Sequence, residues 1–252
     1  MEADSFLSLI KPSAESVPQT PPKVEGTILD RFQMWGKITV ITGAVGAIGD
    51  AVAEGFTKAG SDVAIMDFKL NPAFGTHLQT TYGVLVKSYL VDVTDFEQVQ
   101  NVIKSIEEDF GTIDTFIANA GNTVELWKRL FDVNVHGVFN CAKKKGRDPL
   151  IITASMSGHI INIPNYQTCY NASKAAVIHM AKSLAVEFAG FVRVNSVSPG
   201  YTDTPLPWFV PTEQRAKWWG LTPMGSEALR QDDLATFTTG TDIRVDGGYC
   251  SV

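Results

Sequence analysis

The chain has 252 residues, of which 44% are hydrophobic and 19% charged, and its formal net charge is −6. These values are typical of one α/β domain with a sizeable buried core. A net negative charge does not suit nucleic acid or an anionic membrane, so we expect neither as a partner. The one dense basic run, Lys143–Arg147, is expected to be a solvated surface turn.

Signals for export, membrane insertion and disulfide formation are missing from the sequence. No stretch approaches 18 uncharged apolar residues, and the start Met-Glu-Ala-Asp has no basic region followed by an apolar one. Cys141, Cys169 and Cys250 are an odd number without metal-ligand spacing. We therefore expect reduced thiols, no bound metal and a cytoplasmic location.

Residues 1–33 are expected to form an N-terminal extension rich in Pro and Ser, with prolines at positions 12, 18, 21 and 22. A segment of this composition buries little apolar surface, so we expect it to be draped on the domain or mobile. The folded domain is then expected at 34–252.

Short apolar runs alternate with helical patterns through this domain. Strands are expected at 37–42, 63–66, 84–91, 115–118, 150–153, 192–197 and 242–245, and helices at 51–59, from Thr94 or Asp95 through 106, and at about 170–188. The alternation predicts an α/β fold, a single Rossmann-type domain whose parallel sheet is doubly wound. Ligands of such sheets bind beyond the carboxyl ends of the strands, where the polar and glycine clusters of this chain fall.

A glycine-bearing turn, Thr42–Gly49, follows the first strand and opens the first helix. Its glycines and the helix N-terminus could cradle a pyrophosphate, although a plain connecting turn is an equal alternative for this motif alone. Asp67 ends the second strand, where a carboxylate would bond the ribose hydroxyls of an adenosine and repel a 2′-phosphate. Asp67 therefore favours NAD, and Lys69 keeps NADP as the second choice.

Tyr170 and Lys174 are four residues apart and so lie on one face of the expected helix. An ammonium beside a phenol favours the phenolate and lowers the phenol pKa, which suits a general acid/base. The spacing is common by chance, but Ser155 and Pro199 follow strands that end at the same edge of the sheet. That shared edge favours a catalytic role for the pair.

Further motifs complete an ordered series, which comprises Thr42-Gly43, Ile48-Gly49, Asp92, Asn119-Ala120-Gly121, Asn134, Ser155, Tyr170, Lys174, Pro199-Gly200, Thr204 and Asp246-Gly247-Gly248. This series resembles the short-chain dehydrogenase/reductase family over residues 34–252. Within the family, Ser155–Ile160, Lys217–Trp219 and Val245–Tyr249 look most like fungal polyol and ketose dehydrogenases. These include sorbose reductases, arabinitol and mannitol dehydrogenases, and related yeast carbonyl reductases.

The resemblance implies roles for individual residues. Tyr170 would exchange a proton with the substrate oxygen, Lys174 would support it and bond the nicotinamide ribose, and Ser155 would steady the oxygen. Asn134 would hold a water that links Lys174 to solvent. Cofactor contacts are implied at Gly43, Ala47, Ile48, Gly49, Asp67, Asp92, Val93, Asn119, Ala120, Gly121, Tyr170, Lys174, Pro199, Gly200, Thr202 and Thr204. Substrate contacts are considered at Ser157, His159 and Trp208, with packing as the alternative.

These features predict an oxidoreductase that transfers a hydride between a nicotinamide cofactor and a secondary alcohol or ketone. A sugar alcohol/ketose pair, such as arabinitol, sorbitol or mannitol with its ketose, is the expected substrate. The alternatives are an NADP-linked carbonyl reductase of broad ketone range and, in another class, a nucleotide-binding scaffold without turnover. The resemblance also implies a homotetramer or homodimer.

Three intervals, near 122–123, 142–148 and 225–238, are shorter than the family pattern leads one to expect. We hypothesise that segments of the protein are missing from the sequence at these places. Ala47 stands where the loop of the family usually has its second glycine, and Gly46 comes one place early.

Overall fold

The computed structural model describes residues 27, 29–46, 48–121, 127–143, 148–163, 166–202, 212–223, 241–246 and 250. The chain divides into two units, Met1–Phe32 and Gln33–Val252. In the first unit, the short 3-10 helix η2 (Leu29–Phe32) follows Thr27, which donates its backbone N–H and its hydroxyl to the carboxylate of Asp30. Most of the expected extension 1–33 lies outside the described residues, and its character stays a prediction.

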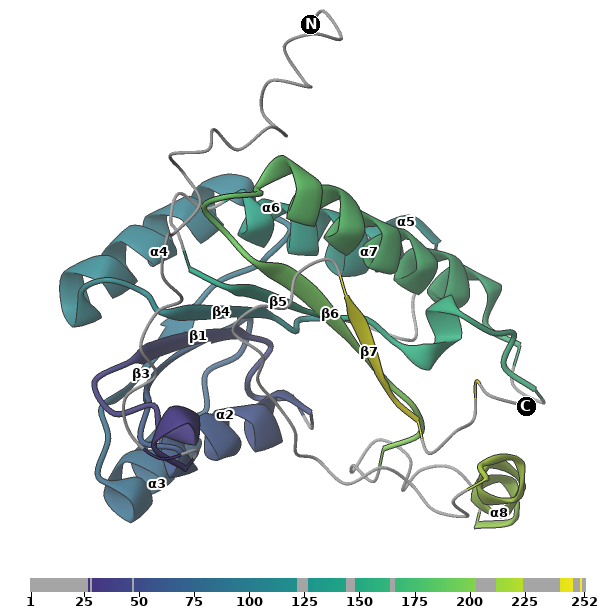
Figure 1. Ribbon diagram of the computed structural model, residues 1–252, viewed down its shortest axis with the longest axis horizontal. Helices are drawn as coiled ribbons and strands as arrows, with labels where there is room; N and C mark the ends of the chain where they lie inside the picture. Colours follow the sequence, from purple (N-terminus) through teal and green to yellow (C-terminus); the bar gives the residue numbers. More distant parts are fainter. Residues whose placement is uncertain are drawn as a thin grey trace, which may run out of the picture. The chain divides into compact units, whose positions relative to one another are not determined.

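The second unit is built on a parallel sheet with helices on both faces (Figure 1). Its seven strands in the described part are ordered β3-β2-β1-β4-β5-β6-β7, and every pairing is parallel. The strands are β1 (Ile38–Thr42), β2 (Asp62–Asp67), β3 (Val86–Leu90), β4 (Thr115–Ala118), β5 (Leu150–Thr153), β6 (Val194–Pro199) and β7 (Asp242–Val245). The strand order reverses between β1 and β4, which is where such sheets hold their ligands. The expected doubly wound Rossmann-type sheet is confirmed.

Helices α2 (Gly49–Lys58) and α3 (Pro72–Tyr82) cover one face of the sheet (Figure 1). The other face is covered by α4 (Phe96–Phe110), α6 (Val138–Ala142) and α7 (Thr168–Glu187). A π-helix, η3 (Asp132–Gly137), joins α6 to the short α5 (Trp127–Phe131). The 3-10 helix η4 (Met156–Gly158) follows β5, and α8 (Thr212–Leu221) comes between β6 and β7 along the chain. No helix in these described ranges is long and apolar enough to cross a membrane.

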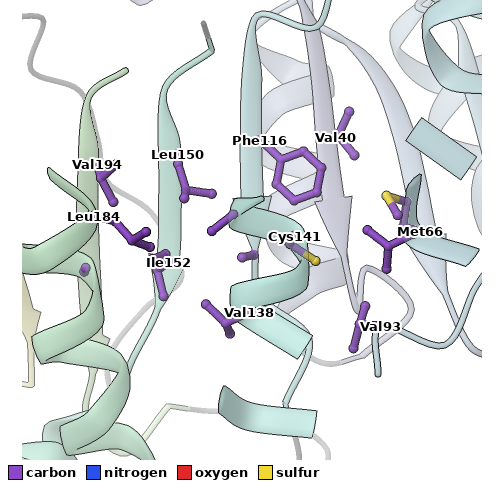
Figure 2. Packing of buried hydrophobic residues seen from close by; sticks show 14 of the residues in the cluster. Val40, Met66, Val93, Phe116, Val138, Cys141, Leu150, Ile152, Leu184 and Val194 are labelled. Carbon is purple, nitrogen blue, oxygen red and sulfur yellow. The ribbon is translucent and has the colours of Figure 1, made fainter. Parts of the chain in front are cut away.

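The two faces of the sheet bury separate hydrophobic clusters, because neighbouring residues of a strand point to opposite sides. In β1, Val40 belongs to the cluster beneath α4, α6 and α7, whereas Ile41 belongs to the cluster beneath α2 and α3. Figure 2 shows the larger cluster, in which Phe116 and Leu150 of the sheet meet side chains of α6 and α7. Cys141 is buried there as a free thiol. These clusters fix the sheet as a rigid platform for the residues at its carboxyl edge.

Helix α3 was not expected from the sequence. Asn71 caps its start by accepting a hydrogen bond from the N–H of Phe74, Pro72 occupies its first turn, and Gly83 ends it at φ 70°. Helix α4 begins after Asp95, one of the two expected caps, whose carboxylate accepts from Gln98 N. It continues beyond the expected end at Ile106 to Phe110.

Some sequence predictions fall outside the described residues. These are the cofactor contacts at Ala47 and Thr204, the substrate contact at Trp208 and most of the intervals at 122–123, 142–148 and 225–238. They stay predictions.

Candidate active site

The carboxyl ends of β1 and β4 are joined by a compact set of hydrogen bonds. Thr42 Oγ1 accepts from the backbone N–H groups of Asn119 and Ala120, each at 3.0 Å. The Asn119 amide in turn donates to the carbonyls of Thr42, at 3.1 Å, and Gly43, at 3.2 Å. The structure therefore brings the Asn119-Ala120-Gly121 motif against the glycine turn, as the sequence predicts.

The glycines of this turn are required by close backbone contacts. Gly43 has φ +66°, and a Cβ there would lie 2.8 Å from the Cα of Ala120. A Cβ at Gly49 would clash with Gly43 O and lie 2.8 Å from the Asn119 side chain. No side chain caps the N-terminus of α2 at Ile48. Asp50 N donates to Gly46 O at 2.8 Å within this turn. N–H groups at a helix N-terminus bind phosphate, so the turn fits the pyrophosphate of a dinucleotide.

Asp67 lies at the end of β2 and is 5% exposed. Its Oδ2 accepts from Val45 N at 3.0 Å, and its Oδ1 accepts from Lys69 N at 3.1 Å. Asp67 thus holds the glycine turn in place, a structural role that the sequence prediction did not include. Each carboxylate oxygen keeps further acceptor capacity for a ligand.

The end of β3 leads to Asp92 and Val93, two more predicted cofactor residues. Asp92 Oδ1 accepts from the backbone and the hydroxyl of Thr94, and Arg129 of α5 lies 3.8 Å from its Oδ2. The Val93 side chain belongs to the larger hydrophobic cluster, and its carbonyl accepts from Asn140 Nδ2 at 3.0 Å. Any contact of Val93 with a cofactor would therefore be made by its backbone.

Ser155, Tyr170, Lys174 and Asn134 are brought together at the start of α7. Ser155 lies near enough to the Tyr170 hydroxyl to lower the pKa of the phenol, and Lys174 Nζ lies 5.7 Å from the centroid of the Tyr170 ring. Lys174 is 4% exposed, and its Nζ donates to the carbonyl of Thr153 at 2.8 Å. A Cβ at Gly121 would lie 3.4 Å from Asn134 Oδ1 and 3.7 Å from Lys174 Nζ, so these two atoms border the same glycine.

The π-helix η3 places Asn134 in this cluster. Asn134 is fully buried, and its Nδ2 donates to Ser173 Oγ at 3.1 Å. Ser173 Oγ donates in turn to the carbonyl of Tyr170 at 2.8 Å. Asn134 therefore supports the first turn of α7, in addition to the water-holding role that the family resemblance implies.

The proton chemistry of the pair differs from the expectation. Burial raises the pKa of Tyr170, and the hydrogen bond from Ser155 lowers it by less. Burial lowers the pKa of Lys174 to about 8. The expected lowering of the Tyr170 pKa by Lys174 is thus wrong for the protein without cofactor, because desolvation outweighs the charge of a lysine that bonds a backbone carbonyl instead.

Ser155 starts a tight turn that packs directly against α7. Its Oγ accepts from Ser157 N at 3.2 Å, which caps η4. A Cβ at Gly158 would lie 2.6 Å from Ile178 Cδ1 and 2.8 Å from the carbonyl carbon of Lys174. Ser157 is 4% exposed, and the side chain of His159 bonds Asp242 rather than facing solvent freely. Their substrate contacts stay predictions.

The end of β6 supplies the predicted nicotinamide segment. Gly200 N donates to the carbonyl of Val245 at 2.9 Å, and a Cβ at Gly200 would lie 2.7 Å from the Cα of Asp246. Thr202 Oγ1 donates to Gly200 O at 3.2 Å. The Trp218 ring of α8 stacks on Tyr201 with centroids 4.4 Å apart, so Trp218 serves packing.

Asn162 was missed by the sequence reasoning. It lies between Ser155 and Tyr170 along the chain and is 1% exposed, yet its Oδ1 and Nδ2 both lack a hydrogen-bond partner. Its neighbours Ile161 and Ile163 are 72% and 53% exposed. From the sequence, an asparagine between two isoleucines would be expected at the surface and the isoleucines inside. The structure has the opposite arrangement, and this is the observation that singles out Asn162.

Comparison with known proteins identifies the family of the chain. A family model described as Enoyl-(Acyl carrier protein) reductase matches residues 43–250. The "Probable NADP-dependent mannitol dehydrogenase" of Yarrowia lipolytica is 46% identical over 263 residues, covering 93% of this chain and 95% of the relative. Sorbose reductase SOU1 of Candida albicans is 43% identical over 277 residues, covering 98% of this chain and 99% of the relative.

A solved structure has the same fold. The NADPH-dependent 3-quinuclidinone reductase from Rhodotorula rubra aligns with a TM-score of 0.84 at 35% identity, covering 93% of this chain and 99% of that one. The alignment with sorbose reductase spans 277 positions whereas this chain has 252 residues, so at least 25 positions have no residue here. The chain belongs to the short-chain dehydrogenase/reductase family.

Proposed function

We propose that this protein is an NADP(H)-dependent oxidoreductase that interconverts an acyclic sugar alcohol and its ketose. The observation that carries the proposal is the cluster of Ser155, Tyr170 and Lys174 at Gly121, in the segment whose Asn119 bonds the glycine turn of β1. Relatives named as mannitol dehydrogenases and sorbose reductases support the substrate class.

The residues present fit a dinucleotide. The uncapped start of α2 and the Gly43 turn would hold the pyrophosphate, and Pro199–Thr202 would hold the nicotinamide end. The bound cofactor supplies or accepts the hydride. In ketose reduction, Tyr170 donates its proton to the substrate oxygen while Ser155 hydrogen-bonds that oxygen, and in alcohol oxidation the proton returns to Tyr170.

The choice of NADP replaces the preference for NAD that Asp67 suggests. Several relatives are named NADP-dependent, and the aligned quinuclidinone reductase is named NADPH-dependent. Both oxygens of Asp67 already accept backbone N–H groups, which disperses the negative charge that would repel a 2′-phosphate. Lys69 is exposed two residues further on, with its Nζ 5.2 Å from the Phe68 ring centroid, and offers a cation for that phosphate.

The test is a steady-state screen of ketoses and sugar alcohols with NADPH and NADH. We expect turnover of fructose, sorbose or a pentulose with a clear preference for NADPH, and loss of that turnover in Tyr170→Phe, which removes only the hydroxyl. Lys69→Ala should raise the KM for NADPH while leaving the KM for NADH unchanged.

Two other results would redirect the proposal. Fast reduction of simple cyclic ketones together with slow reduction of every ketose would favour a carbonyl reductase of broad range, for which the quinuclidinone reductase is the structural precedent. Tight NADPH binding without any turnover would favour a nucleotide-binding scaffold.

A further inference from the structure

A buried carboxylate connects the Ser155 turn to the two last strands of the sheet. Asp242 begins β7, and its side chain is 7% exposed. Its Oδ1 accepts from Ser196 Oγ at 2.6 Å and from Ser198 Oγ at 2.9 Å, both on β6. Its Oδ2 accepts from His159 Nε2 at 2.7 Å, and Ser198 Oγ lies 3.4 Å from the same nitrogen. Both carboxylate oxygens are thus engaged by side-chain donors.

His159 belongs to the turn that presents Ser155. Gly158 N donates to Ser155 O at 3.0 Å, and His159 N donates to Met156 O at 2.8 Å, so the five residues Ser155–His159 form one hydrogen-bonded turn. On one side this unit is pressed against α7 through Gly158. On the other side, the His159 side chain bonds the sheet, to Asp242 Oδ2 at 2.7 Å and, at the longer distance of 3.4 Å, to Ser198 Oγ.

Strand β7 also positions the segment that would hold the nicotinamide. Its far end carries Val245, whose carbonyl accepts from Gly200 N, and Asp246, whose Cα lies against Gly200. The parallel register pairs Ser196 with Asp242 and Pro199 with Val245. One short strand therefore contacts both the Ser155 turn at its start and the Pro199–Gly200 segment at its end.

We propose that His159 is a positioning residue, whose hydrogen bond to Asp242 sets the spacing between Ser155 and the nicotinamide segment. The inference rests on the proposed function, because it concerns the hydride-transfer step. Ser155 holds the substrate oxygen, Pro199–Gly200 holds the ring that exchanges the hydride, and the bond fixes one relative to the other. A misplacement of about 1 Å between reacting groups can cost about 100-fold in rate.

The experiment compares three variants of the full chain. His159→Leu keeps similar volume without a donor, His159→Gln places an amide N–H near the position of Nε2, and His77→Leu on α3 serves as the matched control at an exposed histidine. Single-turnover oxidation of NADPH by saturating ketose reports hydride transfer, and fluorescence titration reports the Kd for NADPH. We expect His159→Leu to slow hydride transfer about tenfold or more while its Kd for NADPH stays at the wild-type value. The control variant His77→Leu should transfer hydride at the wild-type rate. His159→Gln should recover most of the lost rate.

Asp242→Asn tests the same bond from its other end and keeps the shape of the side chain. It should slow hydride transfer in the same direction as His159→Leu, and adding His159→Leu to it should cause little further loss. A wild-type rate in His159→Leu would overturn the proposal. An equal loss in His159→Gln and His159→Leu, or a matching fall in NADPH affinity, would reduce the bond to a structural contact. Wild-type enzyme without ketose turnover would instead refute the proposed function.

Discussion

At the scale of single residues, burial decides the proton chemistry of the site. The raised pKa of Tyr170 keeps the phenol protonated, which suits a group that delivers a proton to a ketose oxygen. Alcohol oxidation needs the phenolate instead and should gain from higher pH. The two directions of the reaction therefore have opposite pH requirements.

The buried Lys174 gives a pH prediction for reduction. Its pKa of about 8 means that its ammonium is present at neutral pH and lost above that value. The charge supports the phenolate that forms when Tyr170 gives up its proton, so kcat/KM for ketose reduction should fall as pH rises through about 8. A pH–rate profile with a stable ketose measures this, and a flat profile up to the ordinary lysine pKa of 10.5 would contradict it.

The same lysine gives a stability prediction. Its folded pKa lies below its ordinary value of 10.5, so between these values the unfolded chain binds more protons and stability rises with pH. The stability lost by burying the charged Lys174 is therefore complete below a pH of about 8. Lys174→Met should raise the free energy of unfolding near neutral pH by about 1–2 kcal/mol while abolishing turnover. Urea denaturation at neutral and strongly alkaline pH would show whether the gain shrinks as pH rises.

Asn162 carries a third residue-scale prediction. Its two buried amide atoms have no hydrogen-bond partner among the described protein atoms. A buried polar group without a hydrogen bond costs roughly 1–3 kcal/mol. Asn162→Leu should therefore raise the melting temperature. If the amide binds a substrate hydroxyl, the KM for the ketose should rise as well. An unchanged KM for the ketose together with a raised melting temperature would show that Asn162 has no role in substrate binding.

At the scale of elements, the contact of η4 with α7 depends on one glycine. Gly158→Ala places a methyl group 2.6–2.9 Å from atoms of Ile178, Lys174 and Ala175. We expect it to destabilise the protein by about 1–3 kcal/mol and to slow turnover, because the Ser155 turn must move. Gly55→Ala in α2 is the matched control, since its Cβ meets nothing within 4 Å and should stabilise the helix by about 0.5–1 kcal/mol. Thermal unfolding and kcat are measured for both.

The elements differ in how well the sequence predicted them. Strands β4, β5 and β7 have the expected bounds, because each is a short apolar or β-branched run that ends in a polar or glycine turn. Helix α3 was missed because only Gly75 and Leu78 are buried on it, which leaves no apolar stripe to detect. Its signals were local instead, at Asn71, Pro72 and Gly83.

The site divides in the same way. The placement of the Gly43 turn, Asn119, Ser155 and Pro199 along one edge of the sheet follows from a general rule of parallel sheets, so the sequence predicted it. The sequence did not predict the direction of the Tyr170 pKa shift or the hydrogen bond from His159 to Asp242. The first depends on desolvation and the second on the register of β6 against β7, and neither can be read from residue spacing.

At the scale of the whole molecule, cofactor binding should couple the glycine turn, α2 and the end of β6 into one cooperative unit. A ligand at 100 times its Kd that binds only the folded state stabilises by about 2.7 kcal/mol. We expect NADPH to raise the melting temperature more than NADH at equal concentration. Tyr170→Phe should keep most of the shift, because the proposed role of the phenol hydroxyl is proton transfer and the glycine turn and Pro199–Thr202 would still hold the cofactor. An equal or larger shift with NADH would contradict the NADP proposal.

The bond between His159 and Asp242 spans 83 residues of sequence. Ribosomes build proteins from the N-terminus, so the Ser155 turn is made long before the strand that fixes it. A nascent chain released before residue 242 would already contain Ser155, Tyr170 and Lys174, but not the strand against which His159 and Gly200 are held. If His159 positions Ser155 as proposed, catalytic competence arrives late in synthesis, and enzyme activity reports whether β7 has reached its place in the sheet.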